Sequence, residues 1–444
     1  MFHPTIRSGF EQVQAEPVDT RLNHYFLEHS YQWIANPEYD FSLWSPPFYA
    51  PAPDILALSD NLLGTAPVYW LNRVFASARH SYQLWLMQIS LLTFLSTLFF
   101  FRSLRVGVIL SLLCSYVFAF GLPRIGQIGH PQLLVQVYTP LMLLCFFRFL
   151  QEPRTRYLGG LALFFFLQLA AGVYLGWFLA LGLMVSGLLY LAVDPAVFLR
   201  CWEYLKANLK SVLLIGGGTL LVTGAFMAPY LRMSKTLEGG WGYETVRNFL
   251  YPLHAWVIPS HTSFLHRRWA ASLYVDNLAE GTHSLGIFGA LLLLCAAAGF
   301  FFYRGPARKK KLLRVCTLTT AVFLLLLTPL TPAFSLWKLV FELVPGAGAI
   351  RAVNRLWVIV YLFWLLAGAL ALQSWLDRRR KVTCVLLLSG LAGWTILENV
   401  QTFIPSFPAA EYEQRVEALV PDLKDRDLVY IIPNPAYNTG AAVL

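Results

Sequence analysis

Charged residues are scarce in this chain of 444 residues: Asp, Glu, Lys and Arg together make up 13% of the sequence, whereas apolar residues make up 57%. Soluble domains usually contain about 25% charged residues. Several apolar segments also reach the roughly 17–25 residues that a helix needs to cross a bilayer. The shortage of charge therefore excludes a water-soluble enzyme built around one large core.

Cysteines and the short motifs of common enzymes are also few or missing. The sequence contains no Walker loop, dinucleotide fingerprint, H-E-x-x-H or G-x-S-x-G motif, so we expect no nucleotide cofactor. The six cysteines fall within apolar segments or beside basic loops, and none lies in a long exterior loop, so the sequence implies no disulfide framework and no metal cluster. They are Cys114, Cys145, Cys201, Cys295, Cys316 and Cys384.

Long apolar segments dominate what is present. They predict an all-α fold, a polytopic transmembrane helical bundle of about ten helices. The stretch 157–193 is too long for one helix, and we divide it at a tight hairpin near Gly172–Gly176. The predicted spans are 80–101, 106–122, 131–150, 157–173, 174–193, 211–231, 284–303, 313–330, 355–375 and 382–400.

Basic residues gather in short loops between alternate spans, where acidic residues are few. The positive-inside rule assigns these loops to the cytosol, and the remaining loops to the exterior. Because the net charge of +10 is distributed in this way and not along one stripe, we expect no nucleic acid partner. The basic loops contain Arg102, Arg105, Arg148, Arg154, Arg156, Arg200, Lys206, Lys210, Arg304, Arg308, Lys309, Lys310, Lys311, Arg314, Arg378, Arg379, Arg380 and Lys381.

This orientation divides the chain into three regions. Residues 1–79 form an exterior segment, 80–400 the bundle, and 401–444 the start of an exterior soluble region. No earlier segment and no signal peptide would carry residues 1–79 outward, so we expect a preceding transmembrane helix to be missing. The stretch 427–433 predicts a strand without a partner, which indicates a truncated C-terminal region as well.

Two helices are expected in the first exterior segment, both lying in the plane of the membrane interface. The first runs from Thr20 to Ala35, with apolar residues largely on one side. The second covers 59–75, begins at Ser59 or Asp60 as the N-cap, and bends at Pro67.

Asp19 stands directly before the first of these helices and has two interpretations. As an N-cap, its carboxylate would accept hydrogen bonds from free backbone amides. As a functional group, it would be a carboxylate held at the membrane boundary, able to act as a base or to bind a metal. The two interpretations are compatible, because the helix end would fix the carboxylate in place.

Further polar residues mark other exterior loops. Arg124 and His130 lie in a short turn with Gln127 and Gln132, where a structural role for the histidine is the alternative. Glu280 and His283 lie where the loop 232–283 re-enters the membrane. With Asp60, they are candidates for the rim of an exterior cleft.

Arg351 and Arg355 precede a late span and are four residues apart, so we expect them to share one face of the helix that begins there. Anchoring at the interface, together with Trp357, is one interpretation. The other is a phosphate clamp, since guanidinium groups match phosphate oxygens in bidentate geometry.

Together these segments resemble the GT-C superfamily of integral membrane glycosyltransferases, which use polyprenyl-phosphate-linked sugars. The resemblance rests on VDTRLNHYFLEHSYQW (18–33), PFYAPAPDILALSDNLLG (47–64), GHPQLLVQVYTPLMLLCFFRFL (129–150) and IRAVNRLWVIVYLFWLLAG (350–368). It covers the first 190 residues fairly well and the later part more thinly. In the family, the late segment often has a proline between two arginines, and this chain has Val353 at that position.

The resemblance implies that Asp19 is the catalytic base, directly or through a divalent cation such as Mg²⁺ or Mn²⁺. It implies that Arg351, Arg355, Arg124 and His130 bind the donor phosphate. The partners would be membrane lipid, a polyprenyl-phosphate sugar donor, and a glycan, lipid or protein acceptor. Transfer would proceed with inversion on the extracytoplasmic side of a bacterial inner membrane.

Three alternatives remain at the level of the sequence. A lipid-linked oligosaccharide ligase or polymerase would have similar topology and a larger donor. A transporter or flippase would need polar groups near the midplane, yet the spans contain few besides Gln88 and Gln168. A membrane scaffold without catalytic activity is the third.

Overall fold

The fold was obtained as a computed structural model, which describes residues 1–15, 17–49, 51–236, 240–258, 263–268, 284–331, 334–411, 413–414 and 417–418. Within these residues the fold is 73% helical, with 17 helices and almost no strand structure. The predicted all-α class is thus confirmed. The predicted strand at 427–433 lies outside the described residues.

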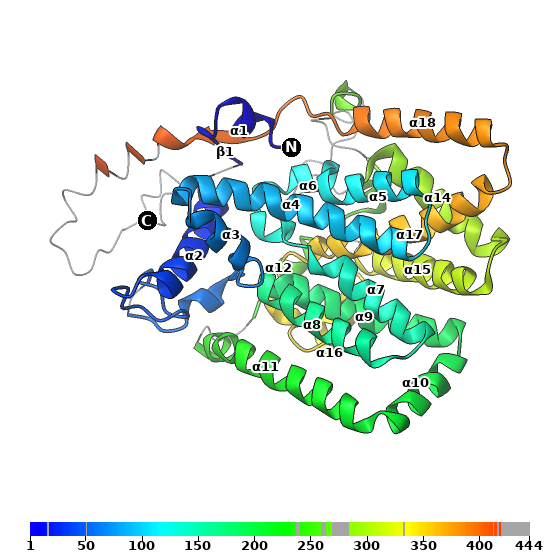
Figure 1. The fold of residues 1–444 in the computed structure, drawn as a ribbon, viewed down its shortest axis with the longest axis horizontal. Helices are drawn as coiled ribbons and strands as arrows, with labels where there is room; N and C mark the ends of the chain where they lie inside the picture. The colour runs from blue at the N-terminus through cyan, green and yellow to red at the C-terminus, as the bar shows by residue number, and fades with distance from the viewer. Residues whose placement is uncertain are drawn as a thin grey trace.

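Helices occupy all ten segments in which the sequence predicts a span (Figure 1). Gly172 separates two of them, as expected for the hairpin. The ten are α4 (Ala78–Ser103), α5 (Val108–Phe120), α7 (Tyr138–Gln151), α8 (Thr155–Ala171), α9 (Val173–Val193), α11 (Leu209–Thr236), α14 (Gly286–Phe302), α15 (Ala307–Leu326), α17 (Trp357–Leu376) and α18 (Lys381–Glu398).

Shorter elements connect these helices or precede them. The other helices are α1 (His3–Arg7), α2 (Pro17–Ala35), α3 (Ala66–Arg73), α6 (Leu122–Gly126), α10 (Ala196–Ala207), α12 (Tyr243–Arg247) and α16 (Trp337–Leu343). The 3₁₀ turns are η1 (Ile55–Leu58), η2 (Pro131–Leu134), η3 (Leu253–Trp256), η4 (Ala347–Ala349) and η5 (Val353–Leu356).

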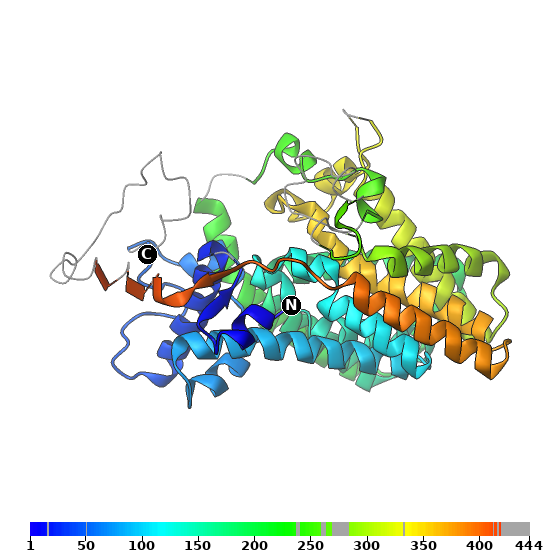
Figure 2. The same ribbon diagram turned by 90° about the horizontal axis from the view of Figure 1, so that it is seen from above.

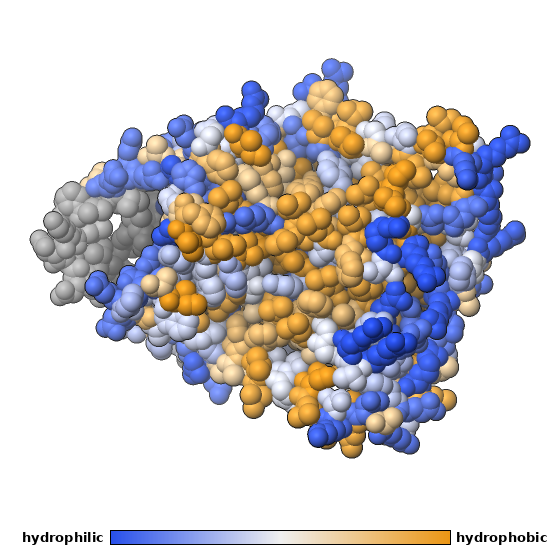
Figure 3. All heavy atoms as spheres, in the orientation of Figure 1, coloured by the Kyte–Doolittle hydropathy of each residue, from blue (hydrophilic) through white to orange (hydrophobic). Residues whose placement is uncertain are grey.

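Seven helical stretches within the described residues are long and apolar enough to cross a membrane. The helices α8 and α14 are apolar but shorter. Figure 3 shows hydrophobic residues across the middle of the molecule and hydrophilic residues gathered toward both ends. This distribution is consistent with a multi-pass membrane protein.

The core is organised around α17. Nearly all of its residues are buried, and it packs against α14, α15, α5 and α9. A helix that is apolar on every side is stable only when it is surrounded, which explains its central position. By contrast, α11 lies at the edge of the bundle, beside α8 and η1, with most of its surface exposed (Figure 1).

A small two-stranded sheet joins the beginning of the chain to the segment after α18. The strand β1 (Gln12–Gln14) runs antiparallel to β2 (Ser406–Pro408), with Val13 opposite Phe407. Figure 2 shows the chain leaving α18 and running back to the N-terminal region. The two segments therefore lie at the same end of the bundle.

The basic loops meet at the opposite end of the bundle. Arg308 pairs with Glu152 at 2.6 Å, and Lys311 pairs with Asp194 at 2.9 Å. Loops that the sequence analysis assigned to the same side of the membrane thus lie together in the structure. We call this end the basic end, and the end with β1 and α2 the Asp19 end.

The segment 59–75 differs from expectation. Its helix, α3, begins only at Ala66, with Thr65 as N-cap, so neither Ser59 nor Asp60 caps it. Pro67 lies in the first turn, where a missing amide hydrogen costs little, and starts the helix without bending it. Residues 59–65 turn inward instead. Gly64 donates its amide to the Ala170 carbonyl at 2.8 Å.

The close approach at Gly64 requires glycine. A Cβ there would collide with the Leu167 carbonyl oxygen and lie 2.6 Å from the Ala171 nitrogen, both rigid backbone groups. Gly64→Ala should therefore destabilise the protein by about 1–3 kcal/mol, the usual cost of overpacking. The measurement is thermal unfolding of the purified protein.

Gly216→Ala provides the matched control, because a Cβ at Gly216 on α11 meets nothing within 4 Å. Its helical position predicts no loss, or a gain of up to about 1 kcal/mol. Equal melting temperatures for the two variants would contradict the packing assigned to Gly64.

Candidate functional site

Asp19 lies in the first turn of α2, which begins at Pro17. It therefore does not stand at the N-cap position that the sequence suggested. Its carboxylate oxygen Oδ2 accepts a hydrogen bond from Gln132 Nε2 at 2.9 Å, and His130 Nε2 lies 3.9 Å from the same oxygen. The side chain is 30% exposed, so this held carboxylate remains accessible to a ligand.

Asn23 fixes the orientation of Gln132. Its side-chain amide donates to the Asp19 backbone carbonyl at 2.7 Å and to Gln132 Oε1 at 2.9 Å. With its oxygen turned toward Asn23, the Gln132 amide presents its NH₂ group to Asp19. Asn23 and Gln132 are both buried, which makes this a rigid support for the Asp19 carboxylate.

Arg124 is only 1% exposed and lies behind the same turn. Its Nη1 donates to the Leu133 carbonyl at 3.0 Å, and its guanidinium group lies over the Phe118 ring at 5.6 Å. A phosphate at the surface would not reach a guanidinium buried to this degree. We therefore assign Arg124 to support of the turn that carries His130 and Gln132.

Asp60 is brought into the site by the inward-turned segment 59–65. It is 7% exposed, and its Oδ1 accepts the Tyr174 backbone amide at 3.2 Å. Burial raises the pKa of the Asp60 carboxyl to about 6. Backbone amides and Arg355 oppose this increase, and the Asp19 charge adds to it. Asp60 thus lies within electrostatic reach of both Asp19 and Arg355.

Neighbouring contacts hold this segment against α11. Asn61 donates its side-chain amide to the Tyr230 hydroxyl at 2.7 Å, and that hydroxyl donates to the Ser59 carbonyl at 2.9 Å. These bonds hold the residues directly before and after Asp60. The position of its carboxylate is consequently set by the fold and not by solvent.

Arg351 and Arg355 do not share the face of one α-helix, because α17 begins only at Trp357. Arg351 precedes η5, whereas Arg355 lies within it. The reason is a bend that ties the segment to α9: the Arg351 amide donates to the Tyr174 hydroxyl at 3.1 Å. Both guanidinium groups nevertheless interact electrostatically with that hydroxyl.

The Arg351 side chain is exposed and lies over two aromatic rings. Its guanidinium carbon is 4.7 Å from the Trp241 ring centroid and 5.4 Å from that of Phe249. The Trp241 amide in turn donates to the Gly348 carbonyl at 2.7 Å. Cation–π stacking orients the guanidinium group while leaving its N–H donors free to bind an anion.

Glu280 and His283, the other predicted rim residues, lie outside the described residues. Within the part of the chain that the structure describes, no three His, Cys, Asp or Glu side chains gather as a metal-binding group. Asp19 and His130 provide two donors, which do not make a complete divalent-cation site. We therefore derive no chemical step through a metal.

We define the Asp19 cluster as the polar residues that these contacts bring together. It combines an accessible carboxylate, a buried carboxylate of raised pKa, and cationic groups, which is an arrangement suited to proton transfer beside an anionic ligand. The cluster consists of Asp19, Asn23, His130, Gln132, Asp60, Tyr174, Arg351 and Arg355.

Two members of the cluster were missed in the sequence. Asn23 follows Asp19 by four residues, the spacing that places two side chains on the same helix face, so its role was recognisable. Tyr174 lies two residues after the hairpin glycine Gly172, but nothing local indicates its contact with Arg351, which is 177 positions further along the chain.

No protein-family model, curated protein sequence or solved structure matches this chain.

The raised pKa of Asp60 makes stability depend on pH. The folded state holds the proton up to about pH 6, whereas the unfolded carboxyl loses it near its ordinary value of 3.8. Stability therefore falls as pH rises from about 4 to about 6, because the folded state binds more protons there. Asp60→Asn should remove this loss, by up to about 3 kcal/mol above pH 6.

Thermal unfolding of both proteins between about pH 4 and pH 7.5 measures the effect. The difference in melting temperature should be near zero at the acidic limit and largest at the neutral one. Asp40→Asn, at an exposed position, removes the same charge and should shift stability little at any pH. A pH-independent difference for Asp60→Asn would contradict the assignment.

Proposed function

We propose that the protein is a membrane protein that crosses the bilayer ten times. Contacts between loops support this number, because residues that contact each other at the ends of helices lie on the same side of the membrane. Asp60 binds the Tyr174 amide, so an even number of helices crosses between them, which requires α8 to cross along with α4, α5 and α7. The short length of α8 is compatible with crossing a thin part of the bilayer.

Two further contacts indicate that α14 and α15 also cross the bilayer. Lys311 pairs with Asp194, so α14 must cross if α11 does. Arg351 then meets Tyr174 only if α15 crosses back. Ten crossings also bring β1 and β2 to one side, as their pairing demands. The positive-inside rule would make the basic end cytosolic.

Cysteine labelling tests this topology. Ala307→Cys, Glu203→Cys and Glu38→Cys lie at exposed positions, the first two at the basic end and the third at the Asp19 end. In a background without the six native cysteines, a membrane-impermeant thiol reagent should modify Glu38→Cys in intact cells and the other two only after lysis. Labelling of both Glu38→Cys and Ala307→Cys in intact cells would rule out ten crossings, because the topology places them on opposite sides.

We further propose that the protein is an inverting GT-C type glycosyltransferase that uses a polyprenyl-phosphate-linked sugar on the extracytoplasmic side of a bacterial inner membrane. The observation that carries the proposal is the Asp19 cluster itself. An accessible carboxylate and two arginines gather at the end opposite the basic loops, where a lipid-linked phosphate would lie at the interface.

The proposed reaction assigns one role to each group. Asp19 takes the proton of the acceptor hydroxyl, and the hydroxyl oxygen attacks the anomeric carbon of the sugar. The bond from that carbon to the phosphate oxygen breaks, and its electron pair leaves with the polyprenyl phosphate. Arg351 and Arg355 stabilise the negative charge that grows on this phosphate. Gln132 and Asn23 are positioning residues for Asp19.

Substitution of Asp19 tests the base. Asp19→Asn retains an acceptor for the Gln132 hydrogen bond but cannot take a proton, so transfer from polyprenyl-phosphate sugars should fall by roughly 100-fold or more. The measurement is radiolabelled sugar transfer from a panel of such donors in proteoliposomes. The control is Asp40→Asn, which removes one negative charge at an exposed position and should retain activity.

The arginine clamp calls for separate variants. Arg351→Gln and Arg355→Gln should lower the transfer rate, whereas the corresponding lysine variants should retain part of it, because charge without bidentate geometry stabilises the phosphate less well. Full activity of Asp19→Asn would overturn the proposed base, and full activity of both glutamine variants would overturn the clamp.

A further inference from the structure

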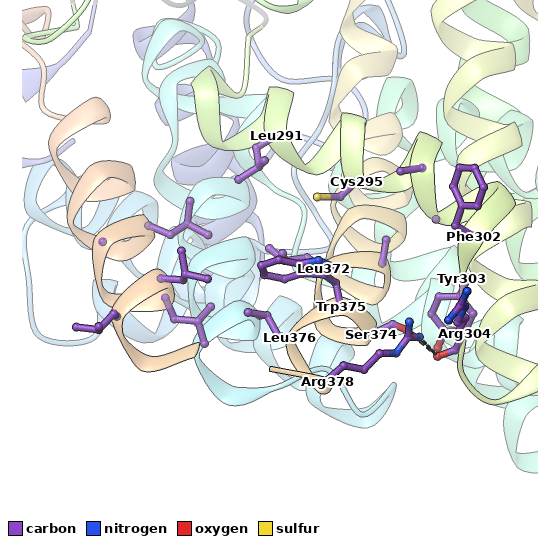
Figure 4. A pocket seen from close by; sticks show the side chains of 18 of the residues that line it. Leu291, Cys295, Phe302, Tyr303, Arg304, Leu372, Ser374, Trp375, Leu376 and Arg378 are labelled. Carbon is purple, nitrogen blue, oxygen red and sulfur yellow. Dashed lines mark hydrogen bonds between the residues drawn. The ribbon is translucent and has the colours of Figure 1, made fainter. Parts of the chain in front are cut away.

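A second candidate site lies away from the Asp19 cluster, between α14, α17 and α18. These three helices enclose a groove of about 820 Å³, within the range of roughly 300–1,000 Å³ typical of ligand sites. Leucine, alanine and glycine residues line most of it, together with Trp394 and with Trp375, which lies beside Ser374 (Figure 4). The groove is thus suited to a hydrocarbon chain.

The helix α18 is held at both ends, and between them it packs only partly against the bundle, so that the groove opens beside it. At its C-terminal end, Glu398 accepts the Ile287 amide at 2.6 Å, and Asn399 accepts the Leu122 amide at 2.8 Å. At its N-terminal end, the Cys384 thiol donates to the Leu376 carbonyl at 3.2 Å. These contacts set the position of α18 beside the groove.

Its basic end carries cationic groups. Arg378 donates to the Arg304 carbonyl at 2.5 Å and to the Ser374 hydroxyl at 3.1 Å, and all three residues line the groove (Figure 4). Arg379, stacked on the Trp375 ring at 4.5 Å, and Arg380 follow in the chain. Asp377 is the acidic residue nearby in sequence, and its carboxylate accepts from Gln373.

The length of the groove matches half of a bilayer. Its lining on α14 runs from Leu291 to Phe302, which is about 17 Å of helix. The hydrocarbon layer of one leaflet is about 15 Å thick. An acyl chain whose head group lies level with Arg304 and Arg378 would therefore fit the groove from its basic end toward the middle of the membrane.

We propose that this groove binds an anionic phospholipid of the leaflet at the basic end. One acyl chain fills the groove, and Arg304 and Arg378 bind the phosphate of the head group. Paired basic side chains at the end of an apolar slot between helices favour an anionic over a zwitterionic lipid. The proposal depends on insertion in a membrane but not on glycosyl transfer.

Two pairs of variants test the head group and the chain separately. The double variant Arg304→Gln/Arg378→Gln removes the proposed phosphate contacts, and Arg154→Gln/Arg156→Gln removes equal charge from another loop at the basic end. Gly390→Leu fills the groove from α18, where an added Cβ meets nothing within 4 Å. Gly393→Leu makes the same change where the residue does not line the groove.

The measurement is binding of spin-labelled phosphatidylglycerol and phosphatidylcholine to the full chain in phosphatidylcholine vesicles. We expect phosphatidylglycerol to bind more tightly to the wild type, and roughly tenfold more weakly to Arg304→Gln/Arg378→Gln and to Gly390→Leu. The two control variants should retain wild-type binding. Equal affinity for both lipids, or unchanged binding by either groove variant, would overturn the proposal. Weakened binding by a control variant would overturn it as well.

Discussion

Burial of α17 on every side is the constraint on which both ends of the molecule depend. Because this helix is apolar throughout, α5, α9, α14 and α15 must surround it, and Trp364 donates its indole N–H to the Gly289 carbonyl at 2.8 Å. The segment that leads into α17 carries Arg351 and Arg355. Its last turns carry Ser374 and, just beyond, Arg378. One buried helix thus fixes the cationic groups of two separate proposed sites.

The two carboxylates of the Asp19 cluster are placed in different surroundings by the same fold. Asp19 sits at a helix start with an amide partner and remains partly exposed. Asp60 is buried because residues 59–65 turn inward. This turn requires glycine at position 64, where the backbone lies against that of α8. Burial raises the pKa of the Asp60 carboxyl, whereas the Asp19 carboxylate remains accessible. Enzymes use such differences in environment to give carboxylates different roles. In the proposed reaction this leaves Asp19 as the base, with Asp60 held near Arg355.

The helices were predictable from the sequence because apolar length and helical spacing are local properties, and all ten expected segments contain a helix. Asp19, the 130–132 turn and the two arginines were also recognisable as polar residues beside apolar segments. The course of residues 59–65 was not, because it is set by backbone contact with Ala170 and by Tyr230 far along the chain. Likewise, burial of Arg124 follows from the packing of the turn over Phe118, which no spacing rule describes.

The two proposed lipid sites lie at opposite ends of the bundle. Asp19 meets Gln132 at one end, whereas the Arg378–Arg304 pair lies at the other with the basic loops. In the proposed topology of ten crossings, these ends would face opposite leaflets. A donor whose phosphate lies at the Asp19 end and a phospholipid whose phosphate lies at Arg378 would then enter from different leaflets. They would not compete for binding, although α17 contributes to both sites.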